Sequence, residues 1–135
     1  MNPVEIEQAL SDFIEEAFDP IEFPFRFLAC FGRKPNELKS LRAGTTNKSE
    51  TEHAVLLRNT IHICVCPHGE VGKHLDILRE APETTKWKAK LTLSTDGESV
   101  EAENVITGET FACDYQSLAD HFGFLLGLAG IATTA

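Results

Sequence analysis

The segment Thr60–Gly69, TIHICVCPHG, decides the fold predicted for this chain. Along it, three β-branched residues alternate with a histidine and two cysteines, as Ile61, Ile63 and Val65 against His62, Cys64 and Cys66. This period of two puts the β-branched side chains on one face and predicts a strand, which the run PHG ends. Whether the opposite face carries chemistry decides most of the functional interpretation.

The sequence on either side of this strand predicts a hairpin that leads into a helix. Before it, Glu52–Arg58 (EHAVLLR) has the character of a second strand, and Asn59-Thr60 is the expected tight turn. After it, the run EVGKHLDILRE has the apolar spacing of an amphipathic helix that ends near Glu80.

Helices are predicted ahead of the hairpin, in a lead-in over residues 1–43. Asn2-Pro3-Val4-Glu5 starts the first one with a capping box, and Asp19-Pro20 ends it. The Phe-rich run FPFRFLACFG predicts a second helix that ends at Gly32, and a third follows from Pro35.

Strands are predicted after the hairpin and its helix. Trp87–Leu93 and Ser99–Glu103 flank an Asp96-Gly97 turn, and Glu109–Ala112 is a shorter strand. Residues 52–113 therefore form a sheet with one intervening helix, and a C-terminal helix over 114–128 is capped by Asp114 or Ser117. The order predicts an α/β (α+β) fold, a three-layer mixed sheet flanked by helices.

Composition bounds the class of protein. A chain of 135 residues predicts a single domain over 1–135, and a net charge of −9 argues against general nucleic-acid binding. Four cysteines without a signal peptide indicate reduced thiols in the cytoplasm. No apolar run approaches the ~18 residues of a membrane span, so no membrane partner is expected.

One stretch is basic, over residues 33–48, and it contains Lys39, Arg42 and Lys48. It has two interpretations. It is a solvated helix face, or its cations and small hydroxyl residues contact the phosphates of a nucleic-acid backbone.

The cysteines of the hairpin resemble a metal cluster, because Cys64-x-Cys66-x-His68 is followed by His74. Structural zinc sites use a C-x₂₋₄-C knuckle with a distant second pair, so the spacing argues against zinc. No histidine here is tied to a carboxylate that would activate a thiol. A buried strand face with small thiols is the favoured account, and no metal ligand is assigned.

Carboxylates gather in the later strands, at Asp96, Glu98, Glu101 and Glu103. Glu101 and Glu103 share a strand face and could bind a divalent metal, but a solvated hairpin face is favoured. The chain has no glycine-rich phosphate loop and no Asn-Pro-Pro-Tyr-like methyltransferase motif.

Several segments in order along nearly the whole chain resemble one family. They are FPFRFLACFG, EHAVLLRNTIHICVCPHGE, KAKLTLSTDGESVEAEN, ITGETFACDY and DHFGFLLGLAGI. The chain resembles the N-terminal domain of MmeI-type enzymes, large single-chain DNA methyltransferases with or without a fused nuclease. The loop LRAGTTNKS is closest to the methyltransferase-only branch.

The resemblance implies a degenerate PD-(D/E)xK nuclease-like fold. In nuclease-bearing members, an acid on the first hairpin strand and Glu-x-Lys on the second hold Mg²⁺ and position water. The matching positions here are Cys64 and Cys66 for Glu-x-Lys, and the first-strand acid falls within one or two residues of Ala54. Glu52 is the only acid near the first position, so the resemblance implies no catalytic residue.

The expected function is a non-catalytic N-terminal accessory domain of a prokaryotic, adenine-specific DNA methyltransferase of restriction-modification type. S-adenosylmethionine is implied for the parent protein. Its methyltransferase and target-recognition domains are expected downstream, and GIATTA is expected to be a place where a longer chain was cut or a linker begins. The domain would pack on them and contact the backbone of double-stranded DNA through Lys39, Arg42 and Lys48.

Two alternatives stay open. The first is an active Mg²⁺-dependent endonuclease with migrated carboxylates, drawn from Glu52, Asp96, Glu101 and Glu103. The second is a free-standing acidic protein-interaction module, which the net charge supports.

Overall fold

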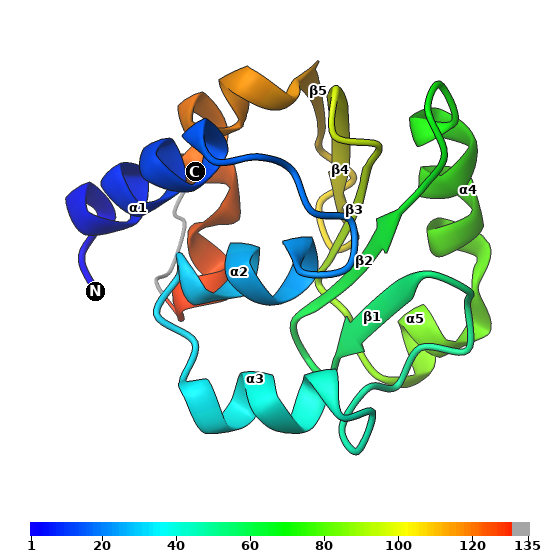
Figure 1. Cartoon of the computed structure of the whole chain (residues 1–135). Coiled ribbons are helices and arrows are strands. Elements are labelled where there is room, and N and C mark those ends of the chain that lie inside the picture. The colour runs from blue at the N-terminus through cyan, green and yellow to red at the C-terminus, as the bar shows by residue number, and fades with distance from the viewer. Residues whose placement is uncertain (131–135) are drawn as a thin grey trace.

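A computed structural model describes residues 1–130 and shows a five-stranded sheet in the order β1-β2-β3-β4-β5 (Figure 1). The strands are β1 (Ala54–Leu57), β2 (Ile61–Val65), β3 (Leu91–Thr95), β4 (Ser99–Asn104) and β5 (Thr110–Asp114). β1 is antiparallel to β2, β2 is parallel to β3, and the remaining pairs are antiparallel. The mixed sheet with flanking helices confirms the predicted α/β class.

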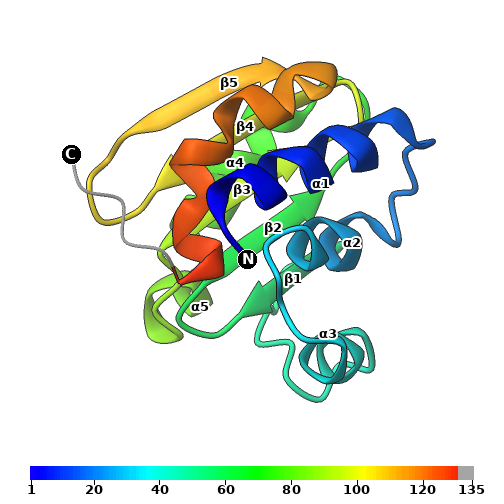
Figure 2. The ribbon, with the colours of Figure 1, turned by 90° about the vertical axis from the view of Figure 1, so that its left-hand side faces the viewer.

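The helices cover both faces of the sheet (Figures 1 and 2). α1 (Pro3–Glu15), α2 (Phe23–Ala29) and the C-terminal η1 (Tyr115–Ala129) lie on one face. α4 (Val71–Glu80) and α5 (Pro82–Lys86) connect the parallel strands β2 and β3 and lie on the other. α3 (Pro35–Arg42) lies at one end of the molecule, beside α2.

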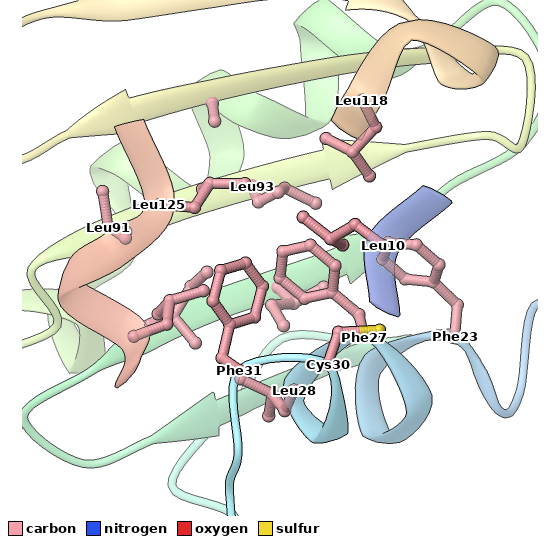
Figure 3. Close-up of a cluster of buried hydrophobic side chains, with 14 of the residues drawn as sticks. Leu10, Phe23, Phe27, Leu28, Cys30, Phe31, Leu91, Leu93, Leu118 and Leu125 are labelled. Carbon is pink, nitrogen blue, oxygen red and sulfur yellow. The ribbon is translucent and has the colours of Figure 1, made fainter. Parts of the chain in front are cut away.

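Two apolar clusters follow from the alternation along β2. Ile61 and Ile63 belong to the main core, together with the aromatic stripe of α2 and apolar residues of β3 and η1. That core contains Leu10, Phe23, Phe27, Phe31, Leu93, Leu118 and Leu125 (Figure 3). Cys64 faces the other way, into a smaller cluster under α4. The predicted period of two is therefore confirmed.

The helix start signals also hold. The side chain of Asn2 accepts the N–H of Glu5 at 2.9 Å, and Glu5 Oε1 accepts the N–H of Asn2 at 3.2 Å, which completes the capping box. Gly32 ends the α2 segment at a φ of 81°, in the left-handed region that glycine favours.

Two strands begin later in the sequence than predicted. β1 starts at Ala54, so Glu52 lies outside the sheet, and β3 starts at Leu91 rather than Trp87. Where a helix break was predicted, α5 begins instead, because Pro82 fits the first turn of a helix. The lysines around Trp87 therefore lie on α5 and the following loop, not on a strand face.

The C-terminal helix has a different form from the one predicted. η1 is a 3₁₀ helix with a non-helical residue at His121, and Asp114 occupies the N-cap position without a side-chain capping bond. Ser117 lies inside the helix. The glycines at 123 and 127 lower the propensity for a regular α-helix. The last residue of DHFGFLLGLAGI and all of GIATTA after Gly130 lie outside the described residues.

Candidate functional site

The three positions matched to the nuclease motif lie together. Ala54 on β1 pairs with Cys64 on β2, and Cys66 follows directly after β2. The Sγ atom of Cys66 lies 3.5 Å from the carbonyl of Thr95 and 3.7 Å from Oγ of Ser94. Ala54, Cys64 and Cys66 are buried in the smaller apolar cluster, with Val71 and Leu78 of α4.

The chemistry of this cluster does not suit a magnesium ion. Burial raises the pKa of the Cys64 thiol to about 11, and it also raises that of Cys66. Both thiols are therefore neutral near pH 7, whereas Mg²⁺ requires hard oxygen ligands in octahedral geometry. Within residues 1–130, no group of three or more His, Cys, Asp or Glu side chains is placed to hold a metal ion.

A hollow of about 560 Å³ borders Ala54 on the side of α2. Its lining is mainly apolar, with Ile21, Pro24, Phe25, Val55 and Val65. Arg42 and His53 are its titratable members, and its lining contains no carboxylate. The hollow is therefore suited to apolar contact rather than to a cation.

Two of the four candidate acids make structural contacts. Asp96 accepts the backbone N–H groups of Gly69, Glu98 and Ser99, each at 2.9 Å. Burial alone would raise the pKa of Asp96, but these donors and the nearby His68 hold it below its usual value. Glu103 accepts Nε of Arg79 at 2.7 Å.

The other two candidate acids lie in different surroundings. Glu52 is exposed in the loop before β1. Glu101 lies on β4, in the same cross-strand row as Ala54, Cys64 and Ser94, and its carboxylate approaches Gly72 at the start of α4. The described structure does not gather the four acids into one metal-binding group.

A buried histidine that the sequence did not single out forms the centre of a polar network. Nδ1 of His62 lies 2.8 Å from Oγ1 of Thr84, and Nε2 lies 2.8 Å from Oγ of Ser49. Thr84 donates its hydroxyl proton to the carbonyl of Leu78 at 2.7 Å. His62 Nδ1–H must then donate to Thr84, which leaves Nε2 to accept from Ser49.

Burial lowers the pKa of His62 to about 4, although the carboxylate of Glu83 opposes the shift. The imidazole is therefore neutral near pH 7. Glu83 is buried and accepts the N–H of Glu50 at 2.8 Å and the hydroxyl of Thr51 at 2.9 Å. The network thus ties the loop before β1 to β2 and α5, which is a structural role.

The predicted DNA-contact residues have different surroundings. Lys39 is exposed on α3. Arg42 donates to Glu22 at 2.7 Å, and its guanidinium lies 4.7 Å from the ring centroid of Phe25. Lys48 lies over Trp87, with Nζ at 4.7 Å from the ring centroid. The contact between Lys48 and Trp87 was not predicted, because Trp87 was expected on a strand and no local sequence pattern indicates it.

The fold and these contacts define a mixed-sheet α/β domain with an apolar cluster where the hairpin meets α4. The chain belongs to the family described as the MmeI N-terminal domain, which matches residues 1–135. It is therefore a domain related to restriction-modification systems and part of a larger protein. No curated protein and no solved structure matches the chain. Among the described helices, none is long and apolar enough to cross a membrane.

Proposed function

We propose that this chain is the non-catalytic N-terminal accessory domain of a DNA-modifying, adenine-specific methyltransferase. One observation carries the proposal. In a member of this family, the positions matched to the nuclease acid and to Glu-x-Lys are Ala54, Cys64 and Cys66, and they are buried together. A methyl group and two neutral thiols cannot hold Mg²⁺ or activate water as two carboxylates and a lysine do.

The domain's contribution would be to pack on the adjoining domains of the parent protein. The hollow beside Ala54 supports this role, since its rim includes Ile21, whose side chain is 77% exposed. Exposed apolar patches with a polar border mark protein interfaces. In this proposal, S-adenosylmethionine and the target base are bound by the downstream domains, in a cytoplasmic enzyme whose free thiols stay reduced.

Contact with the backbone of double-stranded DNA is a further part of the proposal. Lys39 and Arg42 on α3 and Lys48 in the next loop supply cations for phosphate oxygens. Arg42 would have to exchange its ion pair with Glu22 for a phosphate, so we expect Lys39 and Lys48 to contribute more.

A nicking assay tests the non-catalytic assignment. Supercoiled plasmid is incubated with the protein and Mg²⁺ or Mn²⁺, with EDTA as the negative control, and we expect no nicked product. Nicking that is lost in Glu52→Ala or Glu103→Ala, but retained in Glu7→Ala on the exposed face of α1, would establish an active nuclease instead.

Reading the gene beyond the codon for Ala135 tests the rest of the proposal. We expect an open frame that continues into a helical region, an S-adenosylmethionine loop and an Asn-Pro-Pro-Tyr-like motif. A stop codon at that point would favour the acidic interaction module over the accessory domain.

A further inference from the structure

Basic side chains without an acidic partner gather around Trp87. Within residues 1–130, ion pairs hold Arg26, Arg33, Arg42, Lys73 and Arg79. No described ion pair involves the basic residues near Trp87, which are Lys48, Arg58, Lys86, Lys88 and Lys90. We call these five residues and Trp87 the Trp87 surface. In a chain with a net charge of −9, this is a local concentration of uncompensated positive charge.

Backbone hydrogen bonds bring three separate segments together at this surface. The N–H of Asn59, in the β1–β2 turn beside Arg58, donates to the carbonyl of Trp87 at 2.9 Å. The N–H of Lys90 donates to the carbonyl of Thr60 in the same turn at 3.0 Å. The N–H of Lys48 donates to the carbonyl of Leu56 on β1 at 3.1 Å. The turn, the α5–β3 loop and the loop that carries Lys48 therefore meet at one end of the sheet.

The indole ring holds two ammonium groups at this place. Nζ of Lys48 lies 4.7 Å from the ring centroid of Trp87, and Nζ of Lys86 lies 5.4 Å from it. Two like charges so close to one ring would repel, and the negative face of the ring offsets part of that repulsion. Trp87 thus concentrates positive charge instead of offering a bare face for stacking.

Lys88 adds a second, independent observation. Its φ is 58°, in the left-handed region where glycine and asparagine are favoured. A lysine in this backbone conformation has a free-energy cost. Its side chain is exposed, and no ion pair of the described residues offsets that cost. Residues held in such conformations tend to cluster at binding sites.

We propose that the Trp87 surface contacts the phosphate backbone of duplex DNA. Unpaired, exposed Lys and Arg side chains spread over several segments suit a regular row of phosphates. The proposal rests on the proposed function, which places the domain beside DNA, but it moves the main contact from α3 to the α5–β3 loop. The surface lies at the β1–β2 turn, at the opposite end of β2 from Cys66, so the bound backbone would not reach the cysteine cluster.

Trp87 is the single tryptophan of the chain, which makes the test site-specific. Its intrinsic fluorescence and the anisotropy of a short labelled duplex are followed in titrations at several salt concentrations. We expect salt-sensitive binding that changes the Trp87 emission. The variant Lys86→Gln/Lys88→Asn/Lys90→Gln should weaken binding about tenfold at low salt. It should also flatten the slope of log K against log salt by about 0.9 for each phosphate that the variant no longer neutralises.

The matched control is Arg26→Gln/Lys34→Gln/Lys73→Gln, which removes the same charge from exposed residues outside both proposed contacts. It should bind as tightly as the wild type, whereas the α3 variant Lys39→Gln/Arg42→Gln should weaken binding less than the Trp87-surface variant does. Circular dichroism should show that all three variants are folded. Binding weakened as much in the control as in the Trp87-surface variant, binding weakened most in the α3 variant, or preference for single-stranded over duplex DNA would each overturn the proposal. Wild-type protein that binds polyglutamate but not duplex would also overturn it. The proposed non-catalytic role is judged separately, by the nicking assay.

Discussion

Ala54 lies directly opposite Cys64 in the β1–β2 ladder, and both side chains pack against Val71 and Leu78 of α4. This pair occupies positions that the family resemblance matches to the acids of nuclease-bearing members. An acid pair there would need metal or solvent, whereas a methyl group and a thiol need neither. Under the proposed function, this replacement would convert the place where a metal would bind into part of the core under α4.

The variant Cys64→Glu tests whether that conversion is complete. Cys64 is 0% exposed, so its replacement by Glu would bury a carboxyl group in an apolar cluster. We expect a loss of about 3 kcal/mol or more in the free energy of unfolding, measured with urea. Cys64→Ala, which only leaves a small cavity, should cost about 1 kcal/mol.

Addition of Mg²⁺ sharpens this test. The ion should not restore stability to Cys64→Glu, because the cluster contains no other carboxylate to share it. A variant that Mg²⁺ stabilises would show that the cluster still accepts a metal. A variant that is as stable as the wild type without the ion would show that the site still tolerates a buried carboxyl group.

The cysteine cluster could be predicted from the sequence, because it depends on the local alternation of residues along one strand. Alternation along β2 places Cys64 on the face opposite Ile63, and a tight turn at Asn59 fixes which residue of β1 lies across from it. The sequence could not show α5 as a helix, since the run PETTK is short and its helix starts directly at the break that Pro82 signals.

The polar network and the Trp87 surface depend on tertiary contacts between distant segments. Ser49, His62 and Thr84 come from a loop, a strand and a short helix, and nothing in their local sequence indicates that they meet. Lys48 and Trp87 are likewise brought together only when α5 ends beside the β1–β2 turn. Such contacts require the three-dimensional arrangement of the elements.

His62 should make stability depend on pH. Its pKa is lowered from 6.5 to about 4 in the folded protein, so between these values the unfolded chain binds the extra proton. Stability therefore rises with pH in this window and is lost as the pH falls from 6.5 towards 4. The full contribution is about 3 kcal/mol.

Urea unfolding at several pH values between 4 and 7 measures this contribution. The variant His62→Gln should lose most of the slope between pH 6.5 and 4, even though it is less stable throughout. His53→Asn is the control, since His53 is exposed and asparagine accepts its φ of 57°, and it should keep the wild-type slope. An unchanged slope in His62→Gln would show that other groups cause the pH dependence.

Alanine substitutions at two turn glycines can separate the free-energy cost of backbone strain from that of a steric clash. Gly97 and Gly108 have φ values of 89° and 80°, so alanine at either position adopts an unfavourable conformation that costs about 1 kcal/mol. At Gly97 a Cβ atom would also lie 2.7 Å from Cδ2 of Phe18, whereas at Gly108 nothing lies within 4 Å. Phe18 packs against the rings of Phe23 and Tyr115, at 5.6 Å and 5.3 Å between centroids. Displacing it should therefore cost about 1 kcal/mol or more beyond the strain.

We therefore expect Gly97→Ala to lower the free energy of unfolding more than Gly108→Ala does. The same two substitutions in a Phe18→Ala background measure the steric part, because the two sites couple only through that ring. There, both should cost the same, since the added methyl group at position 97 then has room. If the difference between them persisted without the Phe18 ring, the extra cost would arise in the β3–β4 turn itself and not in the packing of Phe18 against α2 and η1.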